Sequence, residues 1–205
     1  MQAQKQKRMT NQERSELSDK RMIAAAIALI LEKGAQKTTL KEVGERAGYS
    51  RGLAGYRFGS KTGLFDFVLR TLNDYWVRDL TAVTAGKVGL EAILAATDKH
   101  YQAFEESPDN VKAFYILWFD VIGSDDVLKQ RVINMNQHRQ KDLRNWILKD
   151  PTLHHQHAEA DAIAGQINST INGIIYQWLL NPNDLATLKS LHNHLNQSLR
   201  LMLNT

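Results

Sequence analysis

The 205-residue sequence contains no cysteine, which excludes disulfide bonds, thiolate zinc sites and cysteine nucleophiles. A long apolar run is also missing. The longest uncharged stretch, residues 162–183, carries amide and hydroxyl side chains along its length, which argues against a membrane span. The N-terminus is polar and basic and lacks the apolar core of a signal peptide. We therefore expect a cytoplasmic protein that does not bind membranes.

Proline is scarce, and Pro108, Pro151 and Pro182 each separate two stretches with helical periodicity. Sustained alternation of apolar and polar residues is lacking as well, so no strands are predicted. The first helix carries an apolar stripe from Ile23 to Leu31 and is expected to end at Gly34. Further helices are expected near residues 40–47, 51–57, from 61 onward, 89–106, 110–122, 126–149, 157–180 and 184–203. The predicted fold class is all-α.

Positive charge is concentrated in the first third of the chain. Residues 1–61 contain 13 Lys and Arg against 6 Asp and Glu, a net charge of +7, whereas residues 62–205 have a net charge of −3. This distribution is expected when one end of a protein meets a polyanion. A solvated basic tail would account for Lys5, Lys7 and Arg8. It would not account for the cations that continue through the patterned region, which are Lys37, Lys41, Arg46, Arg51, Arg57 and Lys61.

Five of the twelve glycines lie between residues 48 and 63, in a segment that ends in Gly59-Ser60-Lys61-Thr62. A nucleotide-binding P-loop requires G-x-x-x-x-G-K-[ST] between a buried strand and a helix. Here a serine separates the glycine from the lysine, and a short amphipathic helix takes the place of the strand. Spacing and context both exclude a P-loop.

Helix signals in the same region predict two short helices joined by a tight turn. Thr39 and Glu42 form a capping-box signature, Gly48 is placed to end the first helix in a left-handed conformation, and Ser50 can cap the second. This layout is typical of a helix-turn-helix, whose second helix enters the major groove of DNA. A glycine-rich hairpin without a partner is the alternative.

The second of these helices carries the candidate DNA contacts. Arg51 and Arg57 are suited to phosphate or guanine, and the Tyr56 hydroxyl is suited to phosphate. Gly52 would allow a close approach to the groove wall. Lys61 and the first amides of the following helix would provide an anion site through charge and helix dipole together.

The run from Ile23 to about Leu69 resembles the N-terminal DNA-binding domain of TetR-type transcriptional regulators. The segments "EKGAQKTTLKEVGERAG" and "YSRGLAGYRFGSKTGLF" carry the likeness, and "YRF", "SK" and "GLF" within the second are that domain's signature. Gly44, Gly55 and Arg57 depart from the family pattern, in which alanine, an aromatic residue and histidine are common at these positions.

The resemblance implies roles for individual residues and for the whole chain. It implies backbone contacts to DNA from Thr39, Ser50, Arg51, Tyr56 and Lys61, and places Gly52 and Leu53 toward the bases. The expected function is that of a ligand-responsive repressor that binds a palindromic operator as a homodimer, with an activator as the second choice. The alternative from another class is a ligand-binding or enzymatic helical protein whose DNA-binding module is vestigial.

The stretch from residue 81 to residue 89 is the expected linker between two domains. Residues 1–80 would form a three-helix DNA-binding domain with a basic tail of about residues 1–14, and residues 81–205 would form a helical effector-binding and dimerisation domain. The last two helices are similar to the bundle through which the family dimerises, and the alternative is that their stripes complete the monomer's core. The residues expected at the dimer interface are Ile167, Ile171, Ile174, Trp178, Leu188, Leu191 and Leu195.

Aromatic residues in the C-terminal part leave two interpretations open, because they suit either plain core or the walls of a pocket for a hydrophobic or aromatic effector. Two asparagines share a helix face there and would orient a ligand or bond across a dimer. The candidate ligand-binding residues are Phe104, Phe114, Trp118, Asn168, Asn172 and Tyr176. The run His154-His155-Gln156-His157 is expected to be a surface loop rather than a metal site. No metal, cofactor or catalytic residue is expected, because no nucleophile elbow or paired acids occur at readable spacing.

Overall fold

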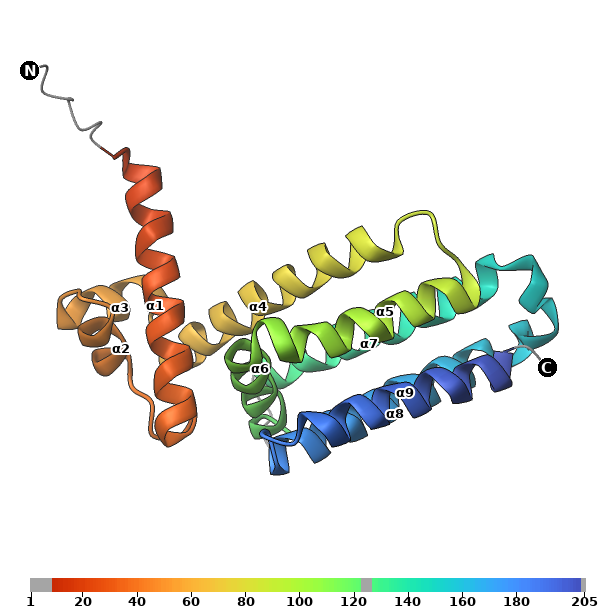
Figure 1. The fold of residues 1–205 in the computed structure, drawn as a ribbon. Helices are drawn as coiled ribbons and strands as arrows, with labels where there is room; N and C mark the ends of the chain where they lie inside the picture. Colours follow the sequence, from red (N-terminus) through yellow and green to blue (C-terminus); the bar gives the residue numbers. More distant parts are fainter. Residues whose placement is uncertain (1–8, 123–126, 204–205) are drawn as a thin grey trace, which may run out of the picture. The chain divides into compact units, whose positions relative to one another are not determined.

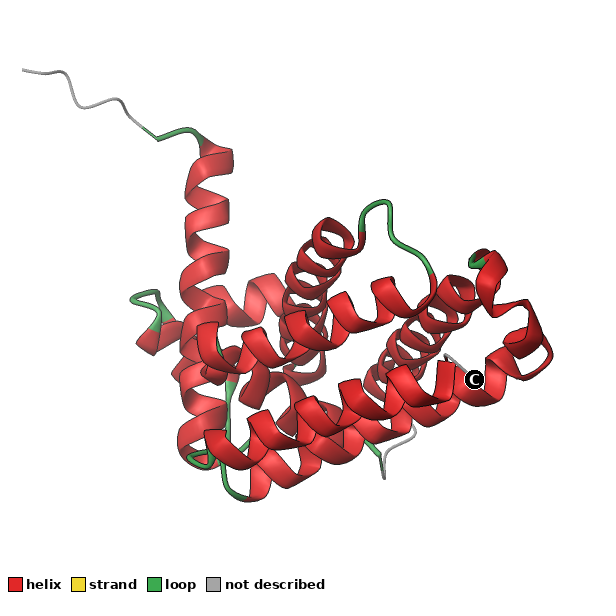
Figure 2. Ribbon diagram, turned by 45° about the vertical axis from the view of Figure 1, so that its right-hand side comes forward, coloured by secondary structure: helices red, strands yellow, loops and turns green. Residues whose placement is uncertain are grey.

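The computed structural model describes residues 9–122 and 127–203, which are helical with no strand among them (Figures 1 and 2). The prediction of an all-α fold is confirmed. The helices are α1 (Asn11–Lys33), α2 (Leu40–Arg46), α3 (Arg51–Phe58), α4 (Lys61–Thr84), α5 (Gly89–Glu106), α6 (Pro108–Asp120), α7 (Val127–Lys149), the 3₁₀ helix η1 (Pro151–Glu159), α8 (Ala160–Leu180) and α9 (Leu185–Leu203). Within the described ranges, none of these helices is both long and apolar enough to cross a membrane.

Local capping explains where the first helices begin and end. At the start of α1 the Thr10 hydroxyl accepts the Glu13 amide at 3.2 Å, and the Glu13 carboxylate accepts the Thr10 amide at 2.7 Å. Thr39 caps α2 by accepting the Glu42 amide, as the sequence predicts. Gly34 and Gly48 end their helices with φ values of 84° and 80°, a region that favours glycine. These expected stops are confirmed.

The chain divides into two compact units, residues 1–68 and residues 69–205. The division lies inside α4, upstream of the linker that the sequence suggested at residues 81–89. The reason is that α4 continues as helix to Thr84, so only residues 85–88 separate it from α5. Residues 1–8 of the expected basic tail lie outside the described residues, and α1 begins within the rest of that tail at Asn11.

The core of the first unit is formed by one apolar face from each of its helices. Met22 and Ile30 of α1, Val43 of α2, Ala54 of α3 and Leu64 of α4 are at most 1% exposed. This burial holds α2 and α3 against the two longer helices, as the helical periodicity of the sequence requires.

In the second unit α5, α7, α8 and α9 lie side by side, and α6 packs against α5 (Figure 1). Five of the seven residues expected at a dimer interface are buried in this unit's own core, namely Ile167, Ile174, Trp178, Leu188 and Leu195. Ile171 and Leu191 are half-buried. The most apolar stripes of α8 and α9 therefore complete the core of the chain itself, which corrects their assignment to a dimer contact.

The segment after Pro151 is more regular than the sequence suggested. His154, His155 and His157 lie in η1 rather than in a loop, and Leu153 anchors this helix with 3% exposure. In the described part of the chain, no group of three or more His, Cys, Asp or Glu side chains is arranged to hold a metal ion.

One close approach of the backbone fixes the start of α4. A Cβ atom at Gly63 would overlap the carbonyl oxygen of Phe58, which is backbone and cannot rotate away. The Gly63 amide also donates to the Ser60 hydroxyl at 3.0 Å, so this residue is held from both sides. Gly55 is different, because a Cβ there would meet no described atom within 4 Å.

We expect Gly63→Ala to lower the free energy of unfolding by about 2 kcal/mol, because the backbone at Phe58 must shift to admit the methyl group. Gly55→Ala is the matched control, and it should stabilise the protein by up to about 1 kcal/mol through helix propensity alone. Urea unfolding followed by circular dichroism measures both. Equal effects of the two substitutions would contradict the close approach at Gly63.

Candidate nucleic-acid interface and interior pocket

The turn between α2 and α3 brings these two helices into close backbone contact. The Tyr49 amide donates to the Gly44 carbonyl at 2.9 Å, which closes the turn. A Cβ atom at Gly44 would lie 3.2 Å from the Ser50 carbonyl oxygen and 3.5 Å from the Ala54 Cβ. Ala47 is also buried, as expected where the two helices cross. Small residues therefore set the angle of the predicted helix-turn-helix.

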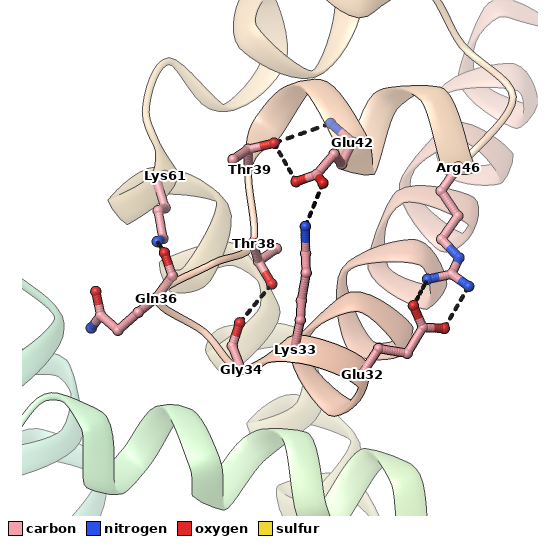
Figure 3. A network of polar contacts seen from close by, with 9 residues as sticks. All are labelled: Glu32, Lys33, Gly34, Gln36, Thr38, Thr39, Glu42, Arg46 and Lys61. Carbon is pink, nitrogen blue, oxygen red and sulfur yellow. Dashed lines mark hydrogen bonds and ion pairs between the residues drawn. The ribbon is translucent and has the colours of Figure 1, made fainter.

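Ion pairs tie α2 to the end of α1 (Figure 3). Arg46 donates to both carboxylate oxygens of Glu32, at 2.6 and 2.5 Å, and this bond lowers the pKa of Glu32 and raises that of Arg46. Lys33 bonds to Glu42, which also accepts the Thr39 hydroxyl, and both bonds lower the pKa of Glu42. Arg46 is therefore engaged within the chain.

Arg57 has an internal partner as well. Its guanidinium pairs with Asp19 of α1 and donates to the Ser15 hydroxyl at 3.0 Å. The position was expected to contact DNA, but in this structure its charge ties the end of α3 to α1. We assign Arg57 to the positioning of α3, because an ion pair that links α3 to α1 restrains the orientation of the helix.

The outward face of α3 carries an aromatic side chain with no role in the core. Tyr56 is 91% exposed, and Gly52 is exposed, while Leu53 is half-buried. Ser50 stands at the N-cap position, but its side chain makes no capping bond within the described residues, so the predicted cap is wrong. The Arg51 side chain lies outside the described part of the structure, although the Arg51 backbone begins α3.

Lys61 lies at the start of α4 and bridges to the loop before α2. Its ammonium donates to the backbone carbonyl of Gln36 at 2.5 Å (Figure 3). The ammonium also lies 5.5 Å from the centre of the Phe65 ring. An ammonium has three donors, so this bond leaves two for another acceptor. The Ser60 hydroxyl already occupies the Gly63 amide, which leaves the earlier amides of α4 for the expected anion site.

Six of the eight residues expected to contact DNA remain candidates, because Arg57 pairs with Asp19 and the Arg51 side chain lies outside the described residues. Thr39, Ser50, Gly52 and Tyr56 are exposed on the first unit, and Leu53 and Lys61 are partly exposed. We call these six residues the candidate interface. Lys37, in the loop before α2, and Lys41, in α2 itself, are exposed and form no ion pair with the described residues, so uncompensated positive charge remains in this unit.

A pocket lies within the second unit between α4, α5, α6, α7 and α8. Its aromatic walls are Trp76, Tyr115 and Trp146, and its polar groups include Thr97, His100, Arg139, Asp142 and Asn168. Only Asn168 was expected among them from the sequence. The Asn168 amide donates to the Asn136 side chain at 2.8 Å within the chain.

The other five residues expected to bind a ligand do not line this pocket. Phe104 is 1% exposed and packs edge-on against Trp178 at 4.7 Å, so it belongs to the core. Tyr176 is 53% exposed on α8, and Asn172 is half-buried. Phe114 and Trp118 are buried, and their rings lie within cation–π distance of the Arg139 guanidinium.

Arg139 is held by aromatic rings rather than by a carboxylate. Its guanidinium lies 4.8 Å from the centre of the Trp118 ring and 5.4 Å from that of Phe114, within the range of cation–π attraction. One nitrogen donates to the Tyr115 hydroxyl at 2.9 Å. Its Nε is buried and has no partner among the described residues.

Two buried histidines meet beside the pocket. His100 Nδ1 lies 2.9 Å from His192 Nε2, and His192 Nδ1 lies 2.9 Å from the Leu188 carbonyl oxygen. Burial, and then the charges of His192 and Arg139, hold the pKa of His100 well below its usual value. Burial also lowers the pKa of His192, against the opposing effect of its bond to Leu188. Both imidazoles are therefore neutral at pH 7. This pair was not predicted from the sequence, where its only signal is a histidine on the apolar face of each of two helices.

Comparisons with known proteins agree with this architecture. The sequence profile of the family described as "Bacterial regulatory proteins, tetR family" matches residues 22–68, which include the helix-turn-helix. A curated relative, the HTH-type transcriptional regulator BetI of Burkholderia mallei, is 35% identical over 86 residues. This match covers 40% of the chain and 44% of BetI, so the chain spans less than half the length of that relative.

Solved structures share the fold over both units. A transcriptional regulator from Rhodococcus sp. Rha1 superposes with a TM-score of 0.77 at 23% identity, over 91% of this chain and 96% of that one. A complex of SmeT with triclosan superposes with a TM-score of 0.73 at 17% identity, over 88% and 90% of the two chains. SmeT is the repressor of a multidrug efflux pump in Stenotrophomonas maltophilia.

The neutral, buried histidines predict a loss of stability in mild acid. Below a pH of about 6.5 the unfolded chain protonates both imidazoles, whereas the folded chain resists protonation, so stability falls as the pH falls. Each such group costs up to about 1.4 kcal/mol per pH unit in this range. Urea unfolding between pH 7 and pH 5.5 measures the slope.

His192→Asn should flatten this slope. His194→Asn is the matched control, because His194 lies on the same helix and makes the same type of bond to a carbonyl one turn earlier, yet is exposed. The control should keep the slope of the natural protein. If His192→Asn kept the full slope as well, the assignment to the buried pair would be wrong.

Proposed function

Because this chain belongs to the TetR family of bacterial regulatory proteins, we propose that it regulates transcription by binding operator DNA through α3. The observation that carries the proposal is the exposed face of α3. Tyr56 is 91% exposed on a helix whose opposite side is fixed by the buried Ala54 and by the ion pair of Arg57. The Tyr56 side chain does not pack in the core, and its hydroxyl is exposed on a helix that is held in place. Such a side chain is suited to contact with a DNA backbone.

The remaining candidate interface supports the same function. Lys61 keeps two donors for a phosphate, and Gly52 adds no side chain that would hold α3 away from a groove wall. The exposed Lys37 and Lys41 add charge that would attract a polyanion. We propose phosphate contacts from Thr39, Ser50, Tyr56 and Lys61, and base contacts from Gly52 and Leu53. The contact from Thr39 requires its hydroxyl to turn from the Glu42 carboxylate to the phosphate, because a hydroxyl has a single donor.

The protein acts as a homodimer on a palindromic operator in this proposal. Support comes from the composition of the outward face of α8. From residue 162 to residue 180 this helix contains no charged residue, and its exposed positions include Ser169, Gly173, Tyr176 and Leu180. A helix face exposed to water normally carries charged side chains. An uncharged face with exposed apolar side chains is instead typical of a surface that another protein chain covers. Two-fold symmetry would then present two α3 helices to two half-sites.

The second unit binds a small effector in this proposal, and the effector lowers operator affinity. The pocket within that unit supports it, because its walls are aromatic and its polar groups have open bonding capacity. Coupling requires that the effector bind the two conformations of the protein with different affinities. Repression that is relieved by the effector is therefore the proposed mode of regulation.

Lys61→Ala should weaken DNA binding uniformly across sequences and reduce the slope of log affinity against log salt by about 1, since one phosphate contact is lost. Lys149→Ala is the charge-matched control, because Lys149 is exposed at the end of α7 in the second unit. Fluorescence anisotropy with a labelled palindrome from the protein's own promoter region, measured at several salt concentrations, gives both quantities. The absence of salt-dependent binding to any genomic fragment would contradict the proposed function.

Gly173→Arg should dissociate the homodimer, because it places a charged side chain at the middle of the uncharged face of α8. A Cβ at Gly173 meets no described atom within 4 Å, so the fold of the monomer should be preserved. Gly173→Ala is the control and should remain dimeric. Sedimentation velocity should give about twice the chain mass of 23.3 kDa for the natural protein and the control. A dimer that survives Gly173→Arg would place the interface elsewhere.

A further inference from the structure

The hydrogen-bond chain behind the pocket determines the tautomer of His100. The Leu188 carbonyl can only accept, so His192 Nδ1 carries a proton and donates to it at 2.9 Å. A neutral imidazole has one proton, which makes His192 Nε2 an acceptor. His100 Nδ1 must then donate to it, also at 2.9 Å. The second nitrogen of His100, Nε2, is left as an unprotonated acceptor.

That acceptor has no partner among the residues that the structure describes. His100 is 7% exposed and lines the pocket, and its Nε2 atom is buried without a hydrogen bond among the described residues. An unsatisfied buried polar atom costs free energy, and native proteins keep few of them. A ligand with an O–H or N–H group would satisfy it.

A second group in the pocket without a hydrogen-bond partner needs an acceptor, whereas His100 Nε2 needs a donor. Arg139 lines the pocket, and its buried Nε–H has no acceptor. Among the described residues no carboxylate lies within ion-pair distance of this guanidinium, and aromatic rings hold it instead. Asp142 also lines the pocket but makes no ion pair with Arg139, and burial raises the pKa of its carboxyl group, which favours the neutral form beside a bound anion. A partly buried cation without a counter-ion is a site for an anionic group.

The walls define the body of the ligand. Trp76 and Trp146 contribute aromatic rings, and Leu80, Leu143 and Ile171 contribute aliphatic surface. Such walls bind an apolar or aromatic ring, while the few polar groups fix its orientation.

We propose that the pocket binds a small aromatic carboxylate that also carries an O–H or N–H group, with the carboxylate on Arg139 and the donor on His100 Nε2. This inference rests on the proposed function in that the second unit holds the effector, and it names the chemical class of that effector. The two polar requirements are independent, because His100 accepts and Arg139 donates. An aromatic acid without a donor group satisfies only one of them.

The test uses 3-hydroxybenzoate and 4-hydroxybenzoate as probes, with benzoate and phenol as comparison ligands that lack one group each. Isothermal titration calorimetry on the full chain, without DNA, measures the affinities. At least one hydroxybenzoate should bind about threefold to tenfold more tightly than benzoate, the usual effect of one neutral hydrogen bond. Phenol should bind more weakly than either acid. If neither hydroxybenzoate binds at millimolar concentration, or if benzoate binds as tightly as both, the proposal is overturned.

Two variants assign the contacts to their residues. Arg139→Gln should reduce hydroxybenzoate affinity by about tenfold to a hundredfold through loss of a charged bond, while Arg200→Gln, at an exposed arginine of α9, should leave it unchanged. His100→Phe keeps a ring of similar size and should reduce hydroxybenzoate affinity to that of benzoate without changing the affinity for benzoate. Equal losses for both ligands would show that His100 only supports the wall. The comparison of ligands on the natural protein needs no variant and stands if a variant does not fold.

DNA binding is measured separately, by anisotropy on the same preparation. A protein that binds DNA with the expected salt dependence but binds neither hydroxybenzoate would overturn the ligand class alone. A protein that binds a hydroxybenzoate but no DNA would overturn the regulatory function and leave the ligand class intact.

Discussion

The close approach of α2 and α3 at Gly44 is the constraint on which the candidate interface depends. Because the Ser50 carbonyl oxygen would lie only 3.2 Å from a Cβ at Gly44, the two helices meet through backbone rather than through long side chains. Backbone contacts have little conformational freedom, so they fix the angle between the helices. At the other end of α3 the ion pair between Arg57 and Asp19 restrains the helix against α1. An exposed residue such as Tyr56 is then presented on a rigid support, as recognition of a groove requires.

The charge pattern of the sequence indicated a polyanion partner, but it did not show which cations face that partner. Helix ends could be predicted because their causes are local, and Thr39, Gly34 and Gly48 act as the sequence indicates. Ion pairs depend on residues far apart in the chain, such as Arg57 with Asp19, 38 positions away. For this reason Arg46 and Arg57 were counted as free charges although each has a carboxylate partner. The surface charge available to DNA is consequently carried by fewer residues, with Lys61 and the exposed Lys37 and Lys41 among them.

Prediction was weaker in the second unit, where position in the sequence does not determine which side of a helix meets a cavity. The sequence shows the apolar stripes of α8 and α9, but an apolar stripe is equally compatible with a core and with an interface. In this structure most of the stripe residues are buried in the core. The aromatic cluster was likewise identified, yet Phe114 and Trp118 hold Arg139 and do not line the pocket. The contact between His100 and His192 joins residues 92 positions apart. Such a contact exists only once α5 and α9 pack together, and it has no local signature.

The two histidines also limit how the pocket can respond to a ligand. The Leu188 carbonyl determines which nitrogen of each imidazole carries the proton. His100 Nε2 therefore remains an acceptor as long as α9 keeps its backbone hydrogen bonds and both imidazoles stay neutral. A ligand that donates to His100 therefore strengthens a chain that ends in the backbone of α9, and a ligand that cannot donate leaves this chain unchanged. By linkage, such a ligand can alter DNA affinity only if it binds one conformation of the protein more tightly than another. Specificity and regulation would then depend on the same hydrogen bond. The donor group of the ligand, which His100 recognises, is also the group that connects the bound ligand to the backbone of α9.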